Sequence, residues 1–167
     1  MDQYQKRYLA HQKRKKEQLI KAMRERYSCR IFSDKALTQK ELDRILDHID
    51  NAPSSCDRRA VELKPVRFRT NKELIGGILV GGVGWIHRAD TIFLLVANKS
   101  AYKEGLDYMP YLDAGFLANY VWLACTMEGI GCCFVNPNVR EENQDILGRY
   151  LLPNELFCGA LAIGYIE

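Results

Sequence analysis

Apolar side chains recur at helical spacing in some parts of the chain and form continuous runs in others. Residues 42–49 show helical spacing directly after a Thr38-x-x-Glu41 capping box, which predicts a helix that ends at residues 51–53. The run TIFLLVAN, residues 91–98, is rich in β-formers and predicts a strand that is covered on both faces. Helix and strand signals therefore alternate, without repeats or a linker, as in one α+β domain.

The remaining elements follow from the same patterns. Residues 3–25 are rich in helix formers but carry few apolar positions, so their first half is expected to be an exposed or partner-bound arm. Pro65 interrupts a strand pattern and favours an edge position for that strand, and Asn71 is expected to cap the helix that follows. The further expected elements are a strand over 61–68, a helix to Leu79, a strand over 132–135, a helix over 140–151 and a strand over 156–166.

The stretch from Pro110 to Glu128 has a helical pattern that is apolar almost all round. A helix without a polar face must be covered, either by its own domain or by a second subunit. In a chain of 167 residues, a fully wrapped helix of this length is easier to explain with a partner chain.

Composition places the chain among ordinary globular proteins, at 47% apolar and 27% charged residues. It has no apolar run long enough for a membrane span, and its charged start does not resemble a secretory signal, so we expect a cytoplasmic protein with no membrane partner. Residues 1–26 carry nine Lys or Arg against three Asp or Glu. A basic stretch of this kind can bind nucleic acid, but it is more often a solvated helix, which is the interpretation we favour. We treat residues 1–18 as a basic arm and residues 19–167 as the domain.

Six cysteines are present, four of them inside apolar stretches (125, 132, 133 and 158), and we expect free buried thiols. None has a neighbouring histidine, so no metal site is expected. His48 and His87 are expected to be structural or surface residues. No Ser-His-Asp or Cys-His arrangement is visible, and an enzyme without an acid–base pair needs a cofactor to supply its reactivity.

Three segments carry candidate chemistry. Arg26, Ser28 and Arg30 offer guanidinium and hydroxyl donors that suit a phosphate, although two arginines four residues apart are also common at a solvated helix end. The stretch PSSCDRR, residues 53–59, could admit a flat ligand or form an ordinary turn. The stretch GIGCCFVNP, residues 129–137, offers close backbone approach but is not a GxGxxG nucleotide motif.

Together these segments resemble the nitroreductase family of flavin-dependent oxidoreductases. The resemblance rests on RYSCRIFSDKALTQKELDRIL, APSSCDRR, GWIHRADTIFLLVAN, YLDAGFLANYVWLACTMEGIGCCFV and ALAIGYI, over roughly residues 19–166. It implies a three-layer α/β/α sandwich with a mostly antiparallel central sheet, an intertwined homodimer, and FMN bound at the dimer interface.

The resemblance also implies roles for individual residues. The phosphate and ribityl chain would be held by Arg26, Tyr27, Ser28 and Arg30. The isoalloxazine ring would be lined from the other subunit by Pro53, Ser54, Ser55 and Asp57, with Asp57 where the family usually has Asn. A backbone N–H from Val135–Asn136 would face flavin N5; Asn136 is the better donor because Pro137 has no N–H. No protein side chain is expected to be catalytic, because the chemistry occurs on the flavin.

The expected function is FMN-dependent reduction of a small acceptor, such as a nitroaromatic or a quinone, by NAD(P)H in ping-pong fashion. Two departures leave alternatives open. Arg59-Ala60-Val61 stands where the family has Q-P-W, and the sequence ends at Glu167, before the tail whose Lys or Arg reaches the phosphate in many members. A flavin-binding dimer with a structural or regulatory role is therefore kept as an alternative. The basic arm separately keeps a nucleic-acid-associated protein as a further alternative.

Overall fold

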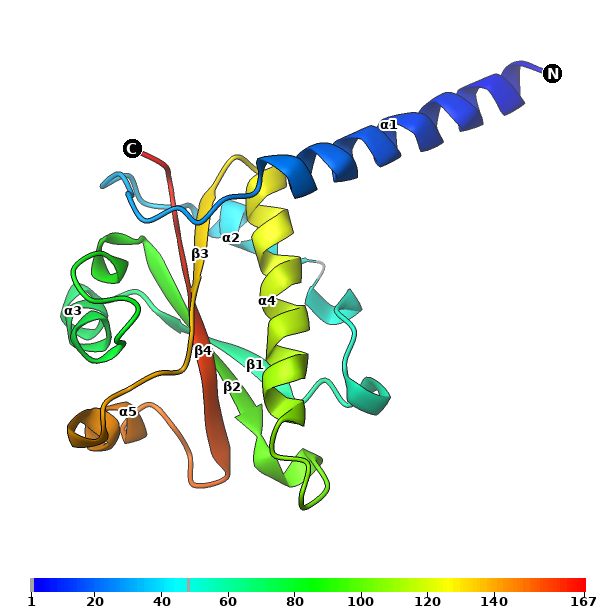
Figure 1. Cartoon of the computed structure of the whole chain (residues 1–167). Helices are drawn as coiled ribbons and strands as arrows, with labels where there is room; N and C mark the ends of the chain where they lie inside the picture. Colours follow the sequence, from blue (N-terminus) through cyan, green and yellow to red (C-terminus); the bar gives the residue numbers. More distant parts are fainter. Residues whose placement is uncertain (1, 48) are drawn as a thin grey trace.

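The computed structural model describes residues 2–47 and 49–167, so His48 lies outside the described residues. A long N-terminal helix, α1 (Gln3–Glu25), projects from the body of the molecule (Figure 1). It begins at a capping box in which the Asp2 carboxylate accepts the Gln5 N–H at 2.7 Å. Within α1, Ala22 is the buried residue. The predicted helix is confirmed, and its first half extends into solvent.

The body is built around a four-stranded sheet in the order β1-β2-β4-β3, with every neighbouring pair antiparallel. The strands are β1 (Val61–Val66), β2 (Thr91–Asn98), β3 (Gly131–Val135) and β4 (Glu155–Gly164). The predicted edge position of β1 is confirmed, and Pro65 is tolerated there because an edge strand leaves one row of backbone groups unpaired. The two central strands are almost completely buried, as the apolar run at 91–98 predicts.

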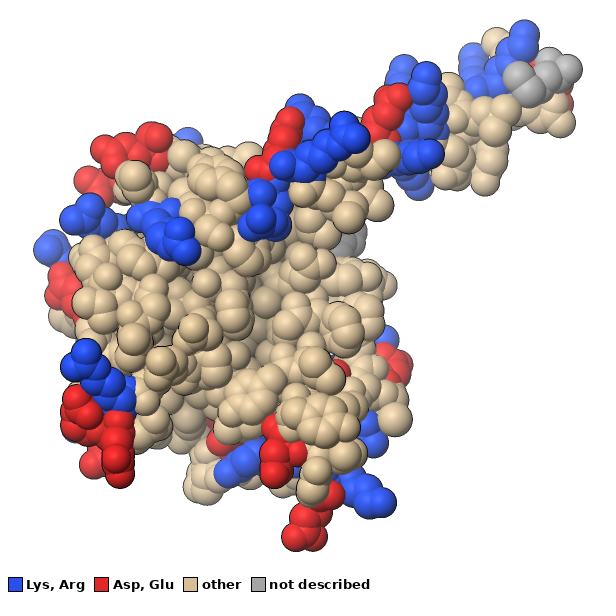
Figure 2. All heavy atoms as spheres, in the orientation of Figure 1, with Lys and Arg blue, Asp and Glu red and all other residues tan. Residues whose placement is uncertain are grey.

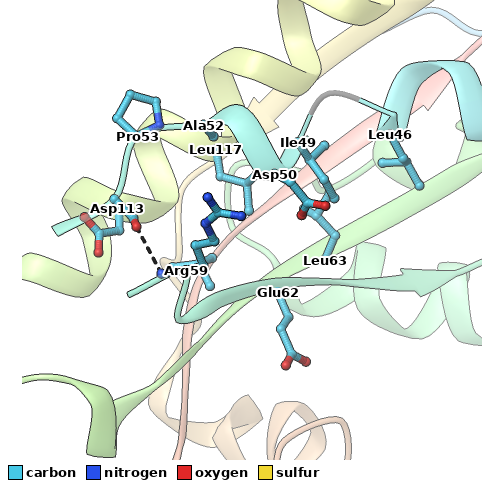
Figure 3. A pocket seen from close by; sticks show the side chains of 12 residues that line it. Leu46, Ile49, Asp50, Ala52, Pro53, Arg59, Glu62, Leu63, Asp113 and Leu117 are labelled. Carbon is cyan, nitrogen blue, oxygen red and sulfur yellow. Dashed lines mark hydrogen bonds between the residues drawn. The ribbon is translucent and has the colours of Figure 1, made fainter. Parts of the chain in front are cut away.

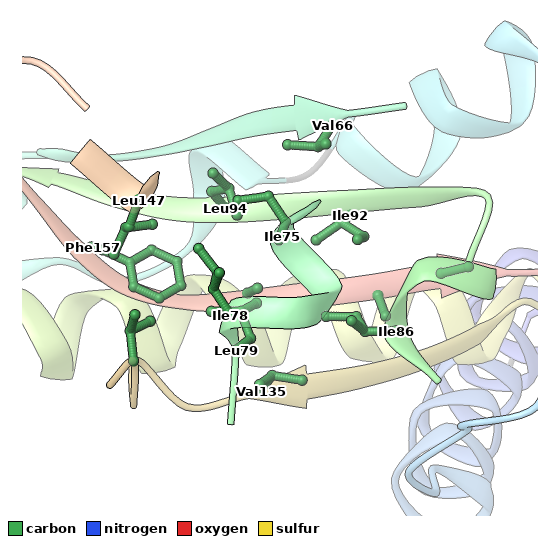
Figure 4. Close-up of a cluster of buried hydrophobic side chains, with 14 of the residues drawn as sticks. Val66, Ile75, Ile78, Leu79, Ile86, Ile92, Leu94, Val135, Leu147 and Phe157 are labelled. Carbon is green, nitrogen blue, oxygen red and sulfur yellow. The ribbon is translucent and has the colours of Figure 1, made fainter. Parts of the chain in front are cut away.

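Helices cover both faces of the sheet, which gives three layers (Figure 1). One face packs against α3 (Arg69–Ile78) and α5 (Gln144–Gly148), and Figure 4 shows its buried side chains, among them Ile75, Leu94 and Phe157. The other face packs against α2 (Gln39–Leu46) and α4 (Met109–Met127). The predicted α+β sandwich with an antiparallel central sheet is confirmed. The 3₁₀ helices are η1 (Ile49–Asn51), η2 (Ser55–Asp57), η3 (Ile86–Arg88), η4 (Lys99–Ala101) and η5 (Glu141–Asn143).

Three of the predicted helix boundaries are wrong. The helix expected to end at residues 51–53 is α2, which ends at Leu46, and the separate η1 (Ile49–Asn51) follows it. Helix α3 begins at Arg69, and the extended Phe68 precedes it as N-cap without a side-chain bond; Asn71 lies inside the first turn and does not cap the helix. The strand end fixes this start, because the Phe68 carbonyl already accepts the Lys72 N–H at 2.9 Å. The helix predicted over 140–151 is divided into η5 and the short α5, since Asn143, at ψ 0°, interrupts the regular backbone between them.

Helix α4 is half covered in the single chain. Its inner face, which includes Ala114, Leu117 and Val121, is buried against the sheet. Its outer face exposes Leu112 and Phe116 at 51% and 49% of their surface. The chain alone therefore does not supply the complete cover that the all-round apolar pattern predicts.

The four cysteines predicted to be buried, at positions 125, 132, 133 and 158, are buried, and all six are free thiols. The described residues contain no group of three His, Cys, Asp or Glu side chains placed to hold a metal ion. None of the described helices is both long enough and apolar enough to cross a membrane. His87 lies half-buried in η3, close to Gly76.

Candidate functional site

The chain leaves α1 at Arg26 and runs as an irregular segment beside β3; we call residues 26–30 the arginine segment. The Arg26 N–H donates to the Ala22 carbonyl at 3.0 Å and closes the last turn of the helix. Cys29 is buried, and its N–H donates to the Cys132 carbonyl of β3 at 3.1 Å. This anchor keeps the neighbouring positions 28 and 30 partly or fully exposed to solvent.

Both guanidinium groups of the arginine segment lie over tryptophan rings. The Arg26 guanidinium carbon is 4.6 Å from the centre of the Trp122 ring, and that of Arg30 is 5.7 Å from the centre of the Trp85 ring. Within the part of the chain that the structure describes, neither guanidinium forms an ion pair with a carboxylate. Both therefore keep N–H donors free for an external anion.

All three donor side chains influence the pKa of one thiol, that of Cys133. Burial raises the pKa of this thiol, whereas the positive charge of Arg30, a hydrogen bond from Ser28 and the charge of Arg26 oppose the rise. An open cavity of about 540 Å³ adjoins the segment and is lined by Tyr27, Ser28, Cys29, Arg30, Ile31, Ile166 and Glu167. Ser28 and Arg30 line this cavity together with the carboxylate residue Glu167, whereas Arg26 is not part of the lining. The cavity therefore offers hydroxyl and guanidinium donors to an oxyanion, and the convergence of all three predicted donors on one anion stays a prediction.

The second candidate segment, residues 53–59, lies against the N-terminal half of α4; we call it the serine loop. Ser55 donates its backbone N–H and its hydroxyl to one carboxylate oxygen of Asp113, at 2.9 Å and 2.8 Å. The Tyr102 hydroxyl donates to the other oxygen at 3.0 Å. Asp113 is only 2% exposed, and burial together with this hydrogen bond raises the pKa of Tyr102. A buried carboxylate with three donors thus ties the loop to α4.

The serine loop has an unusual backbone. Cys56, Asp57 and Arg59 have φ values of 53°, 52° and 50°, in the left-handed region that favours glycine. Internal bonds support it, because the Ser54 hydroxyl accepts the Arg59 N–H at 3.0 Å. Conformations of this kind persist only where the surroundings determine them, and Asp113 is part of those surroundings.

A cavity of about 390 Å³ lies behind the serine loop (Figure 3). The Arg59 side chain extends into it. Its wall includes Val61, so the position at which the sequence departs from Q-P-W borders this hollow. The lining residues are Leu46, Ile49, Asp50, Ala52, Pro53, Ser54, Arg59, Val61, Glu62, Leu63, Asp113 and Leu117.

The third segment begins where β3 ends. Val135 is buried, and Asn136 is exposed directly after it, with its side-chain carbonyl accepting the Asn138 N–H at 3.1 Å. Gly159 of β4, at φ 131°, lies under Phe134 and the Val135 carbonyl; a Cβ built there would be 2.7–2.8 Å from them. The exit of the chain from β3 therefore depends on this glycine.

One chain does not bring all the predicted residues together. The arginine segment contacts α4 at Trp122, and the serine loop contacts it at Asp113. These two positions are nine residues apart along the helix, which corresponds to about 14 Å at 1.5 Å per residue. Each chain thus presents the two predicted half-sites at different ends of the same helix.

Sequence reasoning missed three residues that organise these segments: Asp113, Trp122 and Trp85. Asp113 could have been found, because it is the single charged side chain within α4 and a charge in an apolar helix needs partners. The roles of the tryptophans have no local signal, because Trp122 lies 95 residues from the Tyr27 carbonyl that it contacts and the guanidinium over Trp85 comes from the distant Arg30.

Comparison with known proteins identifies the family. The model of the nitroreductase family matches residues 23–75 and 77–165, so this chain belongs to the nitroreductase family. It is 26% identical over 165 residues to an FMN reductase [NAD(P)H] of Bacillus subtilis (strain 168). That match covers 89% of this chain and 66% of the relative, so the chain spans just under two thirds of that protein's length.

Solved structures share the fold. A nitroreductase family protein from Clostridium novyi NT superposes with a TM-score of 0.76 at 19% identity, covering 89% of this chain and 85% of that one. An FMN-dependent nitroreductase from Clostridium difficile R20291 superposes with a TM-score of 0.74 at 22% identity, covering 89% and 87%. The architecture predicted from the sequence resemblance is therefore that of the family.

Proposed function

We propose that this protein is an FMN-dependent oxidoreductase that uses NAD(P)H to reduce a small acceptor such as a nitroaromatic or a quinone. The observation that carries the proposal is the arginine segment, in which two guanidinium groups without carboxylate partners flank a serine hydroxyl. The chain's membership in the nitroreductase family and its similarity to an FMN reductase also support FMN as the cofactor.

The donor set fits the phosphate of FMN. A phosphate dianion accepts several charge-assisted hydrogen bonds, and Arg26, Arg30 and Ser28 supply donors of the matching kind. We assign Tyr27 to the same segment, and the Asn136 backbone N–H, which follows β3, to the flavin ring near N5. When bound, FMN supplies the redox chemistry by taking hydride from NAD(P)H and passing electrons to the acceptor. The protein residues bind and orient.

We propose that the working form is a homodimer. The outer face of α4 presents Leu112, Phe116 and Tyr120 at intervals of four residues, on one side of the helix. The face of the molecule seen in Figure 2 carries most of its Lys and Arg on α1 and near the margin, and its centre is largely free of charge. A second copy that packs on this face would cover the apolar side chains.

Such a pairing also completes the site. The two half-sites lie at different ends of α4, so a second chain running the opposite way could bring its serine loop to the arginine segment of the first. Pro53, Ser54, Ser55 and Asp57 would then line the flavin from the other subunit. This arrangement accounts for a serine loop that is rigidly held yet distant from the arginine segment of its own chain.

Titration of the purified protein with FMN tests the proposal. We expect one FMN per chain and a dimer in sedimentation. In the Arg26→Ala/Arg30→Ala variant, the loss of two charge-assisted contacts should weaken FMN binding by at least about a hundredfold. The matched control is Arg7→Ala/Arg14→Ala, which removes the same charge from the exposed part of α1 and should bind normally. Unchanged affinity in the first variant would contradict the phosphate assignment.

Turnover separates this function from its alternative. We expect NAD(P)H to bleach the oxidised flavin band without oxygen, and a quinone to restore it. Flavin that stays bound and is never reduced would favour a structural or regulatory flavin-binding dimer. The cytoplasmic location stays a prediction.

A further inference from the structure

We propose that Trp122 and Trp85 are positioning residues that hold the two arginines of the anion site in place. This inference rests on the proposed function, because it concerns how the arginine segment receives a phosphate. The chain has two tryptophans, and each lies under one of these two guanidinium groups, with 4.6 Å between Arg26 and Trp122 and 5.7 Å between Arg30 and Trp85.

Each tryptophan ring is itself fixed by a hydrogen bond to the backbone. The Trp122 indole N–H donates to the Tyr27 carbonyl at 3.2 Å, inside the arginine segment. The Trp85 indole N–H donates to the Gly81 carbonyl at 3.0 Å, and its ring stacks on Phe32 with centres 6.4 Å apart. The two rings come from different elements, α4 and the turn before η3, so the arginines are held from two sides.

Stacking suits an anion site better than a carboxylate partner would. A carboxylate takes the in-plane N–H donors of a guanidinium, and those are the donors that a phosphate needs. An aromatic ring instead takes the flat face of the cation and leaves the in-plane donors free. The absence of ion pairs at Arg26 and Arg30 among the described residues agrees with this division.

Holding the guanidinium planes reduces the ordering that a ligand must impose. Arginine side chains have many rotamers, and a bound phosphate would otherwise have to restrict them. The effect should act on ligands that carry a phosphate and not on the flavin ring alone. Riboflavin, which lacks the phosphate, is therefore the matched comparison for FMN.

The experiment compares FMN and riboflavin binding to Trp122→Leu, Trp85→Leu and the corresponding Phe variants. Leucine keeps an apolar side chain but removes the aromatic face, whereas phenylalanine keeps the face and loses the N–H. We expect each Leu variant to weaken FMN binding about three- to fivefold and the double Leu variant about tenfold or more. Riboflavin binding should stay unchanged, and the Phe variants should recover most of the FMN affinity.

A second measurement does not depend on flavin. The Nε–H signals of Arg26 and Arg30 in a spectrum of arginine-labelled protein should be displaced upfield by the ring currents, and the displacement should vanish in the matching Leu variant. Missing displacements would overturn the stacking. Normal FMN affinity in the Leu variants, or equal losses for riboflavin, would overturn the positioning role. Wild-type protein that binds neither compound would instead contradict the proposed function, and the positioning role would fall with it.

Discussion

The arginine segment and the serine loop both follow helices and both carry polar side chains, yet the chain holds them by different means. The serine loop is tied to α4 by three hydrogen bonds to the buried Asp113 and includes three residues with positive φ. The arginine segment is anchored by the buried Cys29, and its charged ends rest on aromatic rings. Directional bonds fix the loop, whereas stacking leaves the arginine donors free.

Because of this difference, we expect the serine loop to contribute mainly to stability and the arginine segment mainly to ligand binding. Groups that are satisfied inside the chain contribute to folding, and groups that keep free donors are available to a ligand. Substitutions in the serine loop and its anchor should therefore lower the free energy of unfolding. Substitutions in the arginine segment should chiefly lower affinity.

The largest expected effect on stability follows the replacement Asp113→Ala. It leaves the Ser55 N–H, the Ser55 hydroxyl and the Tyr102 hydroxyl without their acceptor, so we expect a loss of about 2–4 kcal/mol in unfolding free energy. Urea denaturation measures this. Asp113→Asn keeps an acceptor oxygen for Ser55 and should lose about half as much. Equal losses for both variants would contradict the hydrogen-bond account.

A smaller effect is expected for Tyr102→Phe. This change removes one hydrogen bond to Asp113 and keeps the ring, so the unfolding free energy should fall by about 1 kcal/mol. Combined with Asp113→Ala, it should add little, because both changes remove the same interaction. Full additivity in a double-mutant cycle would show that the contact contributes nothing.

On the other side of the comparison, Arg30→Ala should change the unfolding free energy by less than about 1 kcal/mol, since it removes one exposed stacking contact. Thermal unfolding without flavin measures this change. A loss as large as that of Asp113→Ala would mean that the arginine segment is a structural element, contrary to the proposed division.

The smallest expected effect is a change in stability at acidic pH, which depends on Glu41. The Tyr165 hydroxyl donates to Glu41, and this bond, together with Thr38, lowers the pKa of Glu41 from 4.5 to about 2. Because the folded state holds this pKa down, the stabilisation is complete above pH 4.5 and is lost as the pH falls towards 2. Glu41→Gln should therefore be less stable than wild type near neutral pH and equal to it near pH 2. A difference that does not depend on pH would contradict this assignment.

Local patterns in the sequence predict most of the elements but few of the contacts between them. Helix-forming composition, the Thr38-x-x-Glu41 capping box and the apolar run at 91–98 depend on neighbouring residues, and they correctly place α1, the start of α2 and β2. The start of α3 was missed because the preceding strand sets it.

The candidate site shows the same limit. Its donor residues stand out in the sequence as a polar cluster, but their supports do not. Ser55 meets Asp113 across 58 positions, and Tyr27 meets Trp122 across 95. Such contacts depend on how the sheet and α4 bring distant segments together, and no periodicity records them.

The most direct measurement of the central claim is the FMN stoichiometry and affinity of the purified wild-type protein, measured beside the Arg26→Ala/Arg30→Ala variant. The account predicts a yellow dimer with one FMN per chain, and a variant that stays folded and loses the cofactor. A colourless wild-type protein that takes up no added FMN would contradict it.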